Sequence, residues 1–190
     1  MQPIRNAAAT REKLLASART RFLEESYESV SLREVARAAG VDVALISRYF
    51  GSKEQLFRAV LHHGDKNWGT LGLSEPDLPE RLAEMLSDHS RDAEHAERFL
   101  IMMRSASSPQ AAAIVSAAFQ EDVLDPLADV LGGTDGKARA AMALSVMMGT
   151  KVVRTFMNPE ATDKTDPDIL HKRLTAILRL ALATGEAVLD

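Results

Sequence analysis

The sequence predicts an all-α fold. Along most of the chain, apolar residues recur at spacings of three and four, which is the period of an amphipathic helix and not the alternation of a strand. Residues that cap helix starts, such as Thr10 and Asp42, stand before such stretches, and Gly40 and Gly51 stand after them. Strand-like runs are short and isolated, and no internal repeat is present.

The composition is that of a globular protein. Hydrophobic residues make up 46% and charged residues 26% of a chain of 190 residues. Because there is no cysteine, a disulfide framework and a thiolate metal site are both excluded. No apolar run approaches the roughly 18 to 20 residues that span a bilayer, and the first residues lack the apolar segment of a secretory signal. We therefore expect a cytoplasmic protein without a membrane partner.

The net charge of −4 conceals an asymmetry between the two ends of the chain. Residues 1–58 carry ten Lys and Arg against seven Asp and Glu, whereas the remainder carries thirteen against twenty. A basic N-terminal part on an acidic body confines attraction for phosphate to one end. By itself this modest difference is weak support for nucleic-acid binding.

The first predicted helix runs from its cap, Thr10, to about Glu25. The preceding arm, residues 1–9, has little periodicity and is expected to be flexible. In the turn after the helix, Tyr27 is expected to fill the core. The apolar residues of the inner helix face are Leu14, Leu15, Ala18 and Phe22.

Residues 31–50 have the spacing of two short helices joined by a tight turn. Ser31 is expected to cap the first helix, with Glu34 completing a capping box. Gly40 supplies the left-handed residue that ends this helix, and Asp42 is expected to cap the second. Helix, glycine turn and helix form a helix-turn-helix, whose second helix enters the major groove of DNA.

The run AGVDVALISRYFGSKEQLF, preceded by TREKLLASARTRFLEESYESVSLREVA, resembles the N-terminal DNA-binding domain of TetR-family repressors. The motif is long and specific. The resemblance implies a three-helix DNA-binding head with most of a connecting helix, residues 9–68. It also implies a helical domain for ligand binding and dimerisation, residues 80–187. One position departs from the family, which usually has tyrosine where this chain has Ser47.

The expected DNA-binding surface is the outward side of the second motif helix, together with the starts of the two neighbouring helices. Arg48 is the best candidate for a base or phosphate contact, because arginine can donate two hydrogen bonds to guanine. Val43 and Leu45 either contact thymine methyl groups or complete the small core. We expect these residues to contact DNA: Ser31, Arg33, Val43, Ala44, Leu45, Ser47, Arg48, Tyr49 and Lys53.

The next helix opens with a second capping box, Ser52 with Gln55, and runs to about Trp68. Lys53 stands in its first turn, where a cation is unfavourable for the helix dipole. A bound phosphate would compensate for that placement; the alternative is a solvated surface lysine. Residues 69–79 include two glycines and two prolines, so we expect a loop there.

The rest of the chain is predicted to be helical. Pro126 removes a backbone hydrogen bond and is expected to kink or divide the helix that contains it. A loop is expected at Asn158–Asp166. The predicted helices cover about 80–90, 96–106, 109–132, 134–157 and 167–185.

Seven of the eight methionines lie at or after Met85. Methionine adapts to irregular apolar ligands, which suits a pocket for a small apolar or amphipathic molecule. Most of these side chains are expected to be ordinary core, and Arg104 pairs either with an acidic ligand group or with an internal carboxylate. The candidate pocket residues are Trp68, Phe99, Met102, Met103, Arg104, Phe119, Met142 and Met147.

The last two predicted helices offer a dimer interface. Small residues repeat at a spacing of four on the first helix, which would allow close helix approach, and an apolar stripe lies on the second. The resemblance implies dimerisation through these helices as a four-helix bundle; the alternative is that they complete the core of one chain. The candidate interface residues are Ala141, Ser145, Gly149, Leu174, Ile177, Leu178 and Ala181.

These features predict a ligand-responsive transcriptional repressor that binds a palindromic operator as a homodimer. The alternatives are an activator of the same fold and an adaptor whose DNA-binding head is degenerate. We expect no enzyme and no cofactor, because a glycine-rich phosphate loop and a histidine–carboxylate pair at metal spacing are both absent. His62 and His63 are adjacent, so they face different sides of a helix, and no metal site is expected.

Overall fold

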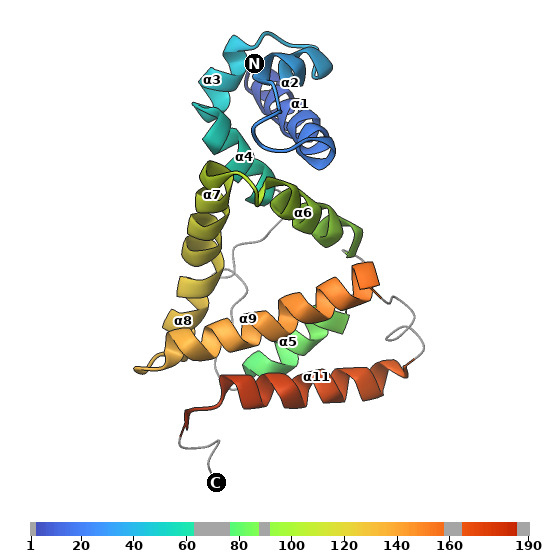
Figure 1. Ribbon diagram of the computed structural model, residues 1–190, viewed down its shortest axis with the longest axis vertical. Helices are drawn as coiled ribbons and strands as arrows, with labels where there is room; N and C mark the ends of the chain where they lie inside the picture. The colour runs from blue at the N-terminus through green and yellow to red at the C-terminus, as the bar shows by residue number, and fades with distance from the viewer. Residues whose placement is uncertain (1–2, 63–76, 88–91, 158–164, 186–190) are drawn as a thin grey trace. The chain divides into compact units, whose positions relative to one another are not determined.

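The computed structural model describes residues 3–62, 77–87, 92–157 and 165–185, and Figure 1 shows their course. Side chains are described from residue 7 and, within the third range, from residue 96. The described residues form helices and no β-strand, so the predicted all-α class is confirmed. The chain divides into two compact units, Met1–Asp65 with Glu97–Ala118 and Lys66–Ala96 with Phe119–Asp190.

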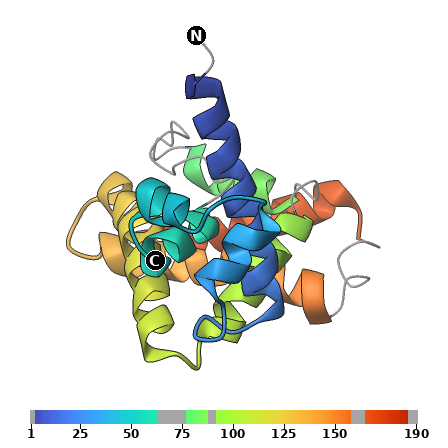
Figure 2. The ribbon, with the colours of Figure 1, turned by 90° about the horizontal axis from the view of Figure 1, so that it is seen from above.

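The first unit contains the predicted head and two helices from later in the chain. Helix α1 begins at Pro3, so the predicted flexible arm is wrong for residues 3–9; the alanine run 7–9 has the highest helix propensity and extends the helix. Figure 2 shows the first turns of α1, in dark blue, extending past the motif helices. The helices of this unit are α1 (Pro3–Glu24), α2 (Leu32–Ala38), α3 (Ala44–Phe50), α4 (Lys53–His62), α6 (Asp92–Ser105) from Glu97 onward, and α7 (Pro109–Phe119) as far as Ala118.

An aromatic cluster forms the centre of the first unit. The ring of Phe57 lies 4.8 Å from that of Phe22 and 5.0 Å from that of Tyr27, both edge-to-face, and Phe22 stacks on Tyr27 at 6.1 Å. All three side chains are buried, so the predicted core role of Tyr27 is confirmed. The predicted inward residues of α1 and α4 are also buried: Leu14, Leu15, Ala18, Leu56, Val60 and Leu61.

Replacing Tyr27 with phenylalanine is expected to make the protein more resistant to alkaline unfolding. Burial, followed by the charges of Glu54 and Glu28, raises the pKa of the Tyr27 phenol to about 12. In the unfolded chain the phenol ionises near its ordinary value of 10.0, so the wild type loses stability as pH rises from there to about 12. Denaturant titrations at several alkaline pH values should show that the free energy of unfolding decreases less with rising pH for Tyr27→Phe than for the wild type. An equal decline in both proteins would contradict this expectation.

The second unit packs α5, α9 and α11 against one another, with α8 against the start of α9 (Figure 1). Helix α5 begins at Leu78, so the end of the predicted loop is helical; residues 69–76 lie outside the described part of the chain. None of the described helices is long and apolar enough to cross a membrane. The elements are α5 (Leu78–Ser87), η3 (Gln120–Leu124), α8 (Asp125–Leu131), α9 (Gly136–Val152), η4 (Val153–Met157) and α11 (Pro167–Leu182).

Pro126 divides the long predicted helix as expected. The chain forms a π-helical turn over Gln120–Leu124, and α8 then starts with Pro126 in its first turn. A proline is tolerated there because the first turn of a helix does not use that backbone N–H.

Candidate nucleic-acid interface

One glycine and one side-chain cap shape the helix-turn-helix. Gly40 has φ of 68°, the left-handed conformation that ends α2 without steric cost. The Asp42 carboxylate accepts a hydrogen bond from the Ala44 backbone N–H at 2.7 Å, so the predicted cap of α3 is confirmed. The predicted capping box on α2 is wrong, because Ser31 makes no side-chain cap bond and Glu34 lies 3.7 Å from an arginine of the next turn.

The outward side of α3 exposes both polar and apolar side chains. Ala44, Ser47 and Arg48 are exposed, and Val43, at the start of the helix, is 39% exposed. Two other predicted contacts, Leu45 and Tyr49, are half-buried and pack against the core of the first unit. On the neighbouring helix α2, Arg33 is exposed and Ser31 is half-buried.

The Lys53 ammonium group makes two defined contacts within the head. Its Nζ donates to the Glu28 carbonyl at 3.3 Å and lies 4.7 Å from the centre of the Tyr27 ring. Partial burial lowers the pKa of Lys53, although Glu28 and Glu54 act in the opposite direction. Lys53 is therefore held by the α1–α2 turn, at the start of α4.

The same turn is fastened to the start of α7. The Ser108 hydroxyl donates to the Glu28 carboxylate at 2.5 Å and accepts from the Ala111 N–H at 3.1 Å. Two residues further on, the Gln110 amide donates to Glu54 at 2.6 Å. Hydrogen bonds from Ser52 and Gln110 contribute to holding the pKa of Glu54 below its usual range. The sequence does not predict these contacts; its local signal is Ser108 standing before a proline, as a helix cap does.

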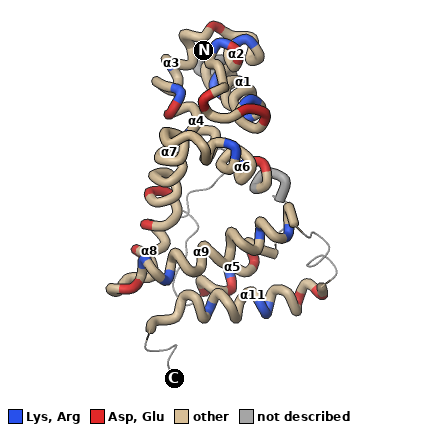
Figure 3. The backbone as a smooth tube through the Cα atoms, viewed as in Figure 1, with Lys and Arg blue, Asp and Glu red and all other residues tan. Residues whose placement is uncertain are grey.

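Lys and Arg positions are spread over α1, α2 and α3 of the head (Figure 3). Several of those on α1 pair with carboxylates of the same unit: Arg19 lies 2.7 Å from Glu97, and Arg21 lies 3.3 Å from Glu25. Arg33 and Arg48 remain exposed beside the motif.

The predicted ligand residues are distributed over both units. Phe99 and Met102 are half-buried and Met103 is exposed in the first unit, whereas Phe119, Met142 and Met147 belong to the second. Met142 is exposed and Met147 is buried in the core. Arg104 donates to the Glu24 carbonyl at 3.3 Å, which is neither of the partners expected for it. Trp68 lies outside the described residues.

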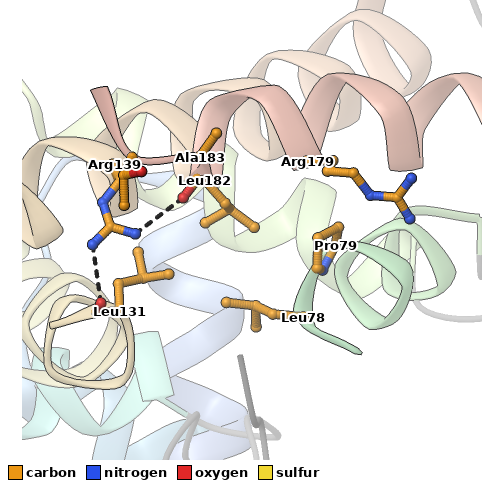
Figure 4. Close-up of a pocket in the computed structure, with 8 residues that line it drawn as sticks. Leu78, Pro79, Leu131, Arg139, Arg179, Leu182 and Ala183 are labelled. Atoms are coloured by element: carbon orange, nitrogen blue, oxygen red, sulfur yellow. Dashed lines mark hydrogen bonds between the residues drawn. The ribbon is translucent and has the colours of Figure 1, made fainter. Parts of the chain in front are cut away.

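A cavity of about 440 Å³ lies within the second unit (Figure 4). Arg139, on its wall, donates to the backbone carbonyls of Leu131 at 2.9 Å and Leu182 at 3.0 Å. The methionine-based prediction did not include the residues around this cavity, which come from helices distant in sequence. They are Leu78, Pro79, Leu131, Arg139, Arg179, Leu182, Ala183 and Thr184.

The candidate dimer residues separate into two groups. Leu174, Leu178 and Ala181 are buried in the core of the second unit, where α11 packs against α5 and α9, so their assignment to a dimer surface is revised. Ile177 is 49% exposed on the other side of α11. On α9 the small residues Ala141, Ser145 and Gly149 are exposed.

Family models match both parts of the chain. Residues 14–60 match the model described as bacterial regulatory proteins, tetR family, and residues 77–182 match that of a tetracyclin repressor-like C-terminal domain. The second match alone covers more than half of the chain. The chain belongs to the TetR family. Its fold is accordingly an all-α TetR fold with an N-terminal helix-turn-helix and a helical C-terminal domain.

Three individual proteins are similar to this chain, one in sequence and two in structure. The transcriptional repressor AcnR of Corynebacterium glutamicum is 33% identical over 82 residues, 43% of this chain and 43% of that relative, so the alignment spans less than half of its length. NalD of Pseudomonas aeruginosa, the secondary repressor of the MexAB-OprM multidrug efflux pump, superposes with a TM-score of 0.69 at 18% identity, covering 91% of this chain and 95% of NalD. A SmeT–triclosan complex gives 0.63 at 21% identity, covering 88% and 90%. At these identities the two structures establish the fold.

Proposed function

We propose that this protein is a transcriptional repressor that binds double-stranded DNA through its helix-turn-helix. The observation that carries the proposal is the exposed side of α3, where Ser47 and Arg48 stand on a helix fixed by the Asp42 cap and Gly40. A helix presented in this way fits the major groove, where arginine recognises guanine. The repressor names of AcnR and NalD support the direction of regulation.

The proposed DNA-bound form is a homodimer on a palindromic operator. Two symmetric helix-turn-helix heads require a site with two inverted halves. The exposed side of α9 and α11 supplies a surface for the partner, because Met142, Met148, Ile177 and Leu180 leave apolar area in contact with water. Exposed small residues between them, such as Ser145 and Gly149, would allow two helices to approach closely.

We further propose that a small apolar or amphipathic molecule releases the operator. The SmeT–triclosan complex provides an example of such a ligand on this fold. Release requires that the ligand favour a head position that fits DNA poorly, which is a shift between two populated states. The bonds from Ser108 and Gln110 to Glu28 and Glu54 tie the head to the start of α7 and can transmit that shift.

Two alternatives share the fold. An activator differs only in where its operator lies relative to a promoter. The features that favour an adaptor with a degenerate head are the apolar Val43 and the serine at position 47. An adaptor would bind its partner equally well in the presence of competitor DNA.

Selection of bound sequences from random duplex DNA tests the proposal directly. We expect inverted repeats that bind with salt-dependent affinity, and we expect Arg48→Ala to weaken binding to them about tenfold or more, since a bidentate arginine–guanine contact contributes about 1–3 kcal/mol. Arg37→Ala, which removes an exposed arginine paired with Glu34, is the matched control and should change little. Failure of the folded wild type to enrich any sequence would refute DNA binding, and single half-sites would refute the dimer.

A further inference from the structure

A second cavity lies within the first unit, where α3 ends. We call it the α3-end cleft. Its volume is about 290 Å³, and it opens between α1, the last residues of α3 and one side of α4. The residues around it are Arg11, Tyr49, Phe50, Gln55, Arg58, Ala59 and His62.

The lining of the α3-end cleft is cationic. It contains the guanidinium groups of Arg11 and Arg58, and none of the described residues around it is Asp or Glu. Arg11 lies 5.0 Å from the centre of the Phe50 ring, which fixes it against the end of α3. Its ion pair with Glu12, at 3.5 Å, joins two largely exposed side chains and competes little with another anion.

The second arginine of the cleft is only partly solvated. Arg58 is half-buried, so its interaction with an anion is screened less than that of an exposed arginine. Gln55 and Tyr49 add an amide and a hydroxyl that can donate hydrogen bonds. Two guanidinium groups with neutral donors form the set that recognises the tetrahedral oxygens of a phosphate.

The cleft is continuous with the expected DNA-binding surface. Tyr49 belongs to both, and it directly follows Arg48 on α3. When a helix occupies the major groove, the phosphates of the two strands border the groove and lie beside the ends of that helix. The C-terminal end of α3 therefore lies where a phosphate of the bound duplex is available.

We propose that the α3-end cleft binds a phosphate group of the DNA backbone, with Arg11 and Arg58 donating to its oxygens and Tyr49 beside them. The inference rests on the proposed function and extends the DNA contacts to α1 and to the middle of α4, which the helix-turn-helix motif does not include. Such a contact fixes the position of α3 in the groove and carries no sequence preference of its own.

The salt dependence of DNA binding tests this inference. The slope of log Kobs against log salt concentration is negative. Its magnitude decreases by about 0.9 for each phosphate that the protein no longer neutralises. Measured by fluorescence anisotropy on a selected operator duplex, Arg11→Gln/Arg58→Gln is expected to flatten the slope by about 0.9 and to weaken binding at low salt roughly tenfold. Arg58→Lys keeps the charge but loses the planar fork, so we expect it to keep the slope.

Arg21→Gln is the matched control, because it makes the same charge change on α1 at a residue that pairs with Glu25. Its slope should equal that of the wild type. An unchanged slope in the folded double variant would overturn the inference, even though the wild type binds DNA; absence of DNA binding by the wild type would instead refute the proposed function. If the double variant does not fold, Arg11→Gln decides in its place, since this side chain is exposed.

A free anion could use the same chemistry as a DNA phosphate. Thermal unfolding with sodium pyrophosphate, against potassium chloride of equal ionic strength, separates the two sources. Stabilisation of the wild type but not of the double variant, together with an unchanged DNA slope, would make the cleft a small-anion site and overturn its role in DNA binding. A flattened DNA slope supports the inference.

Discussion

Replacing Arg139 with alanine is expected to lower the free energy of unfolding by about 3 kcal/mol or more. This side chain is buried, and each of its guanidinium nitrogens donates a hydrogen bond. The acceptors are the Asp135 carboxylate at 2.9 Å and the carbonyls of Leu131, Gly132 and Leu182 at 2.9, 2.7 and 3.0 Å. Three of these are carbonyls at helix ends, which have no helical partner. Alanine would leave them without a donor and would open a cavity between α8 and α11.

Denaturant unfolding followed by circular dichroism gives the measurement for Arg139→Ala. Arg179→Ala is the control, since Arg179 is 67% exposed in its side chain and pairs with Glu80. An exposed ion pair contributes about 0–1 kcal/mol, so this variant should resemble the wild type. Equal stabilities of the two variants would show that the carbonyl contacts of Arg139 contribute little.

Replacing Phe57 with alanine is expected to destabilise the head by about 3–5 kcal/mol and to abolish DNA binding under conditions in which the wild type binds. Phe57 is fully buried and contacts the rings of both Phe22 and Tyr27. Its removal leaves a cavity between α1, α4 and the turn before α2. That turn contains the Glu28 carbonyl, which accepts a hydrogen bond from Lys53. Weaker packing of the turn would therefore also displace Lys53 on the proposed DNA-binding surface.

Phe57→Leu is the matched control, because it keeps most of the apolar volume and removes only the aromatic contacts. We expect it to lose less stability than Phe57→Ala and to retain DNA binding at low temperature. Thermal unfolding and anisotropy on the same samples provide both measurements. Full DNA binding by Phe57→Ala would mean that the aromatic cluster is not needed to position α3.

Local structure could be predicted well wherever one residue decides it. Gly40 and Asp42 act as expected, because a left-handed turn and a helix cap depend on the residue itself and its immediate neighbours. Ser31 shows the limit of that reasoning: its capping box is replaced by a pair between Glu34 and Arg37. A sequence pattern does not reveal which of two competing partners a side chain takes.

Burial could be predicted, but the partner that causes it could not. The apolar stripe predicted on α11 is buried at Leu174 and Leu178, which pack against helices of the same chain, but it is half exposed at Ile177. Periodicity shows that a face is covered without showing by what. The same limit applies to the ligand residues, because a cavity depends on how distant helices approach, and the one in the second unit is lined by none of the predicted methionines.

Glu28 accepts two hydrogen bonds: its carbonyl accepts one from Lys53, and its carboxylate accepts one from the Ser108 hydroxyl. The contact with Lys53, on the proposed DNA-binding surface, and the contact with Ser108, before α7, are thus separated by a few covalent bonds within one residue. A rotation of this single turn would change both contacts together. In the proposed release of the operator, Glu28 would therefore connect Ser108 to Lys53 within one residue.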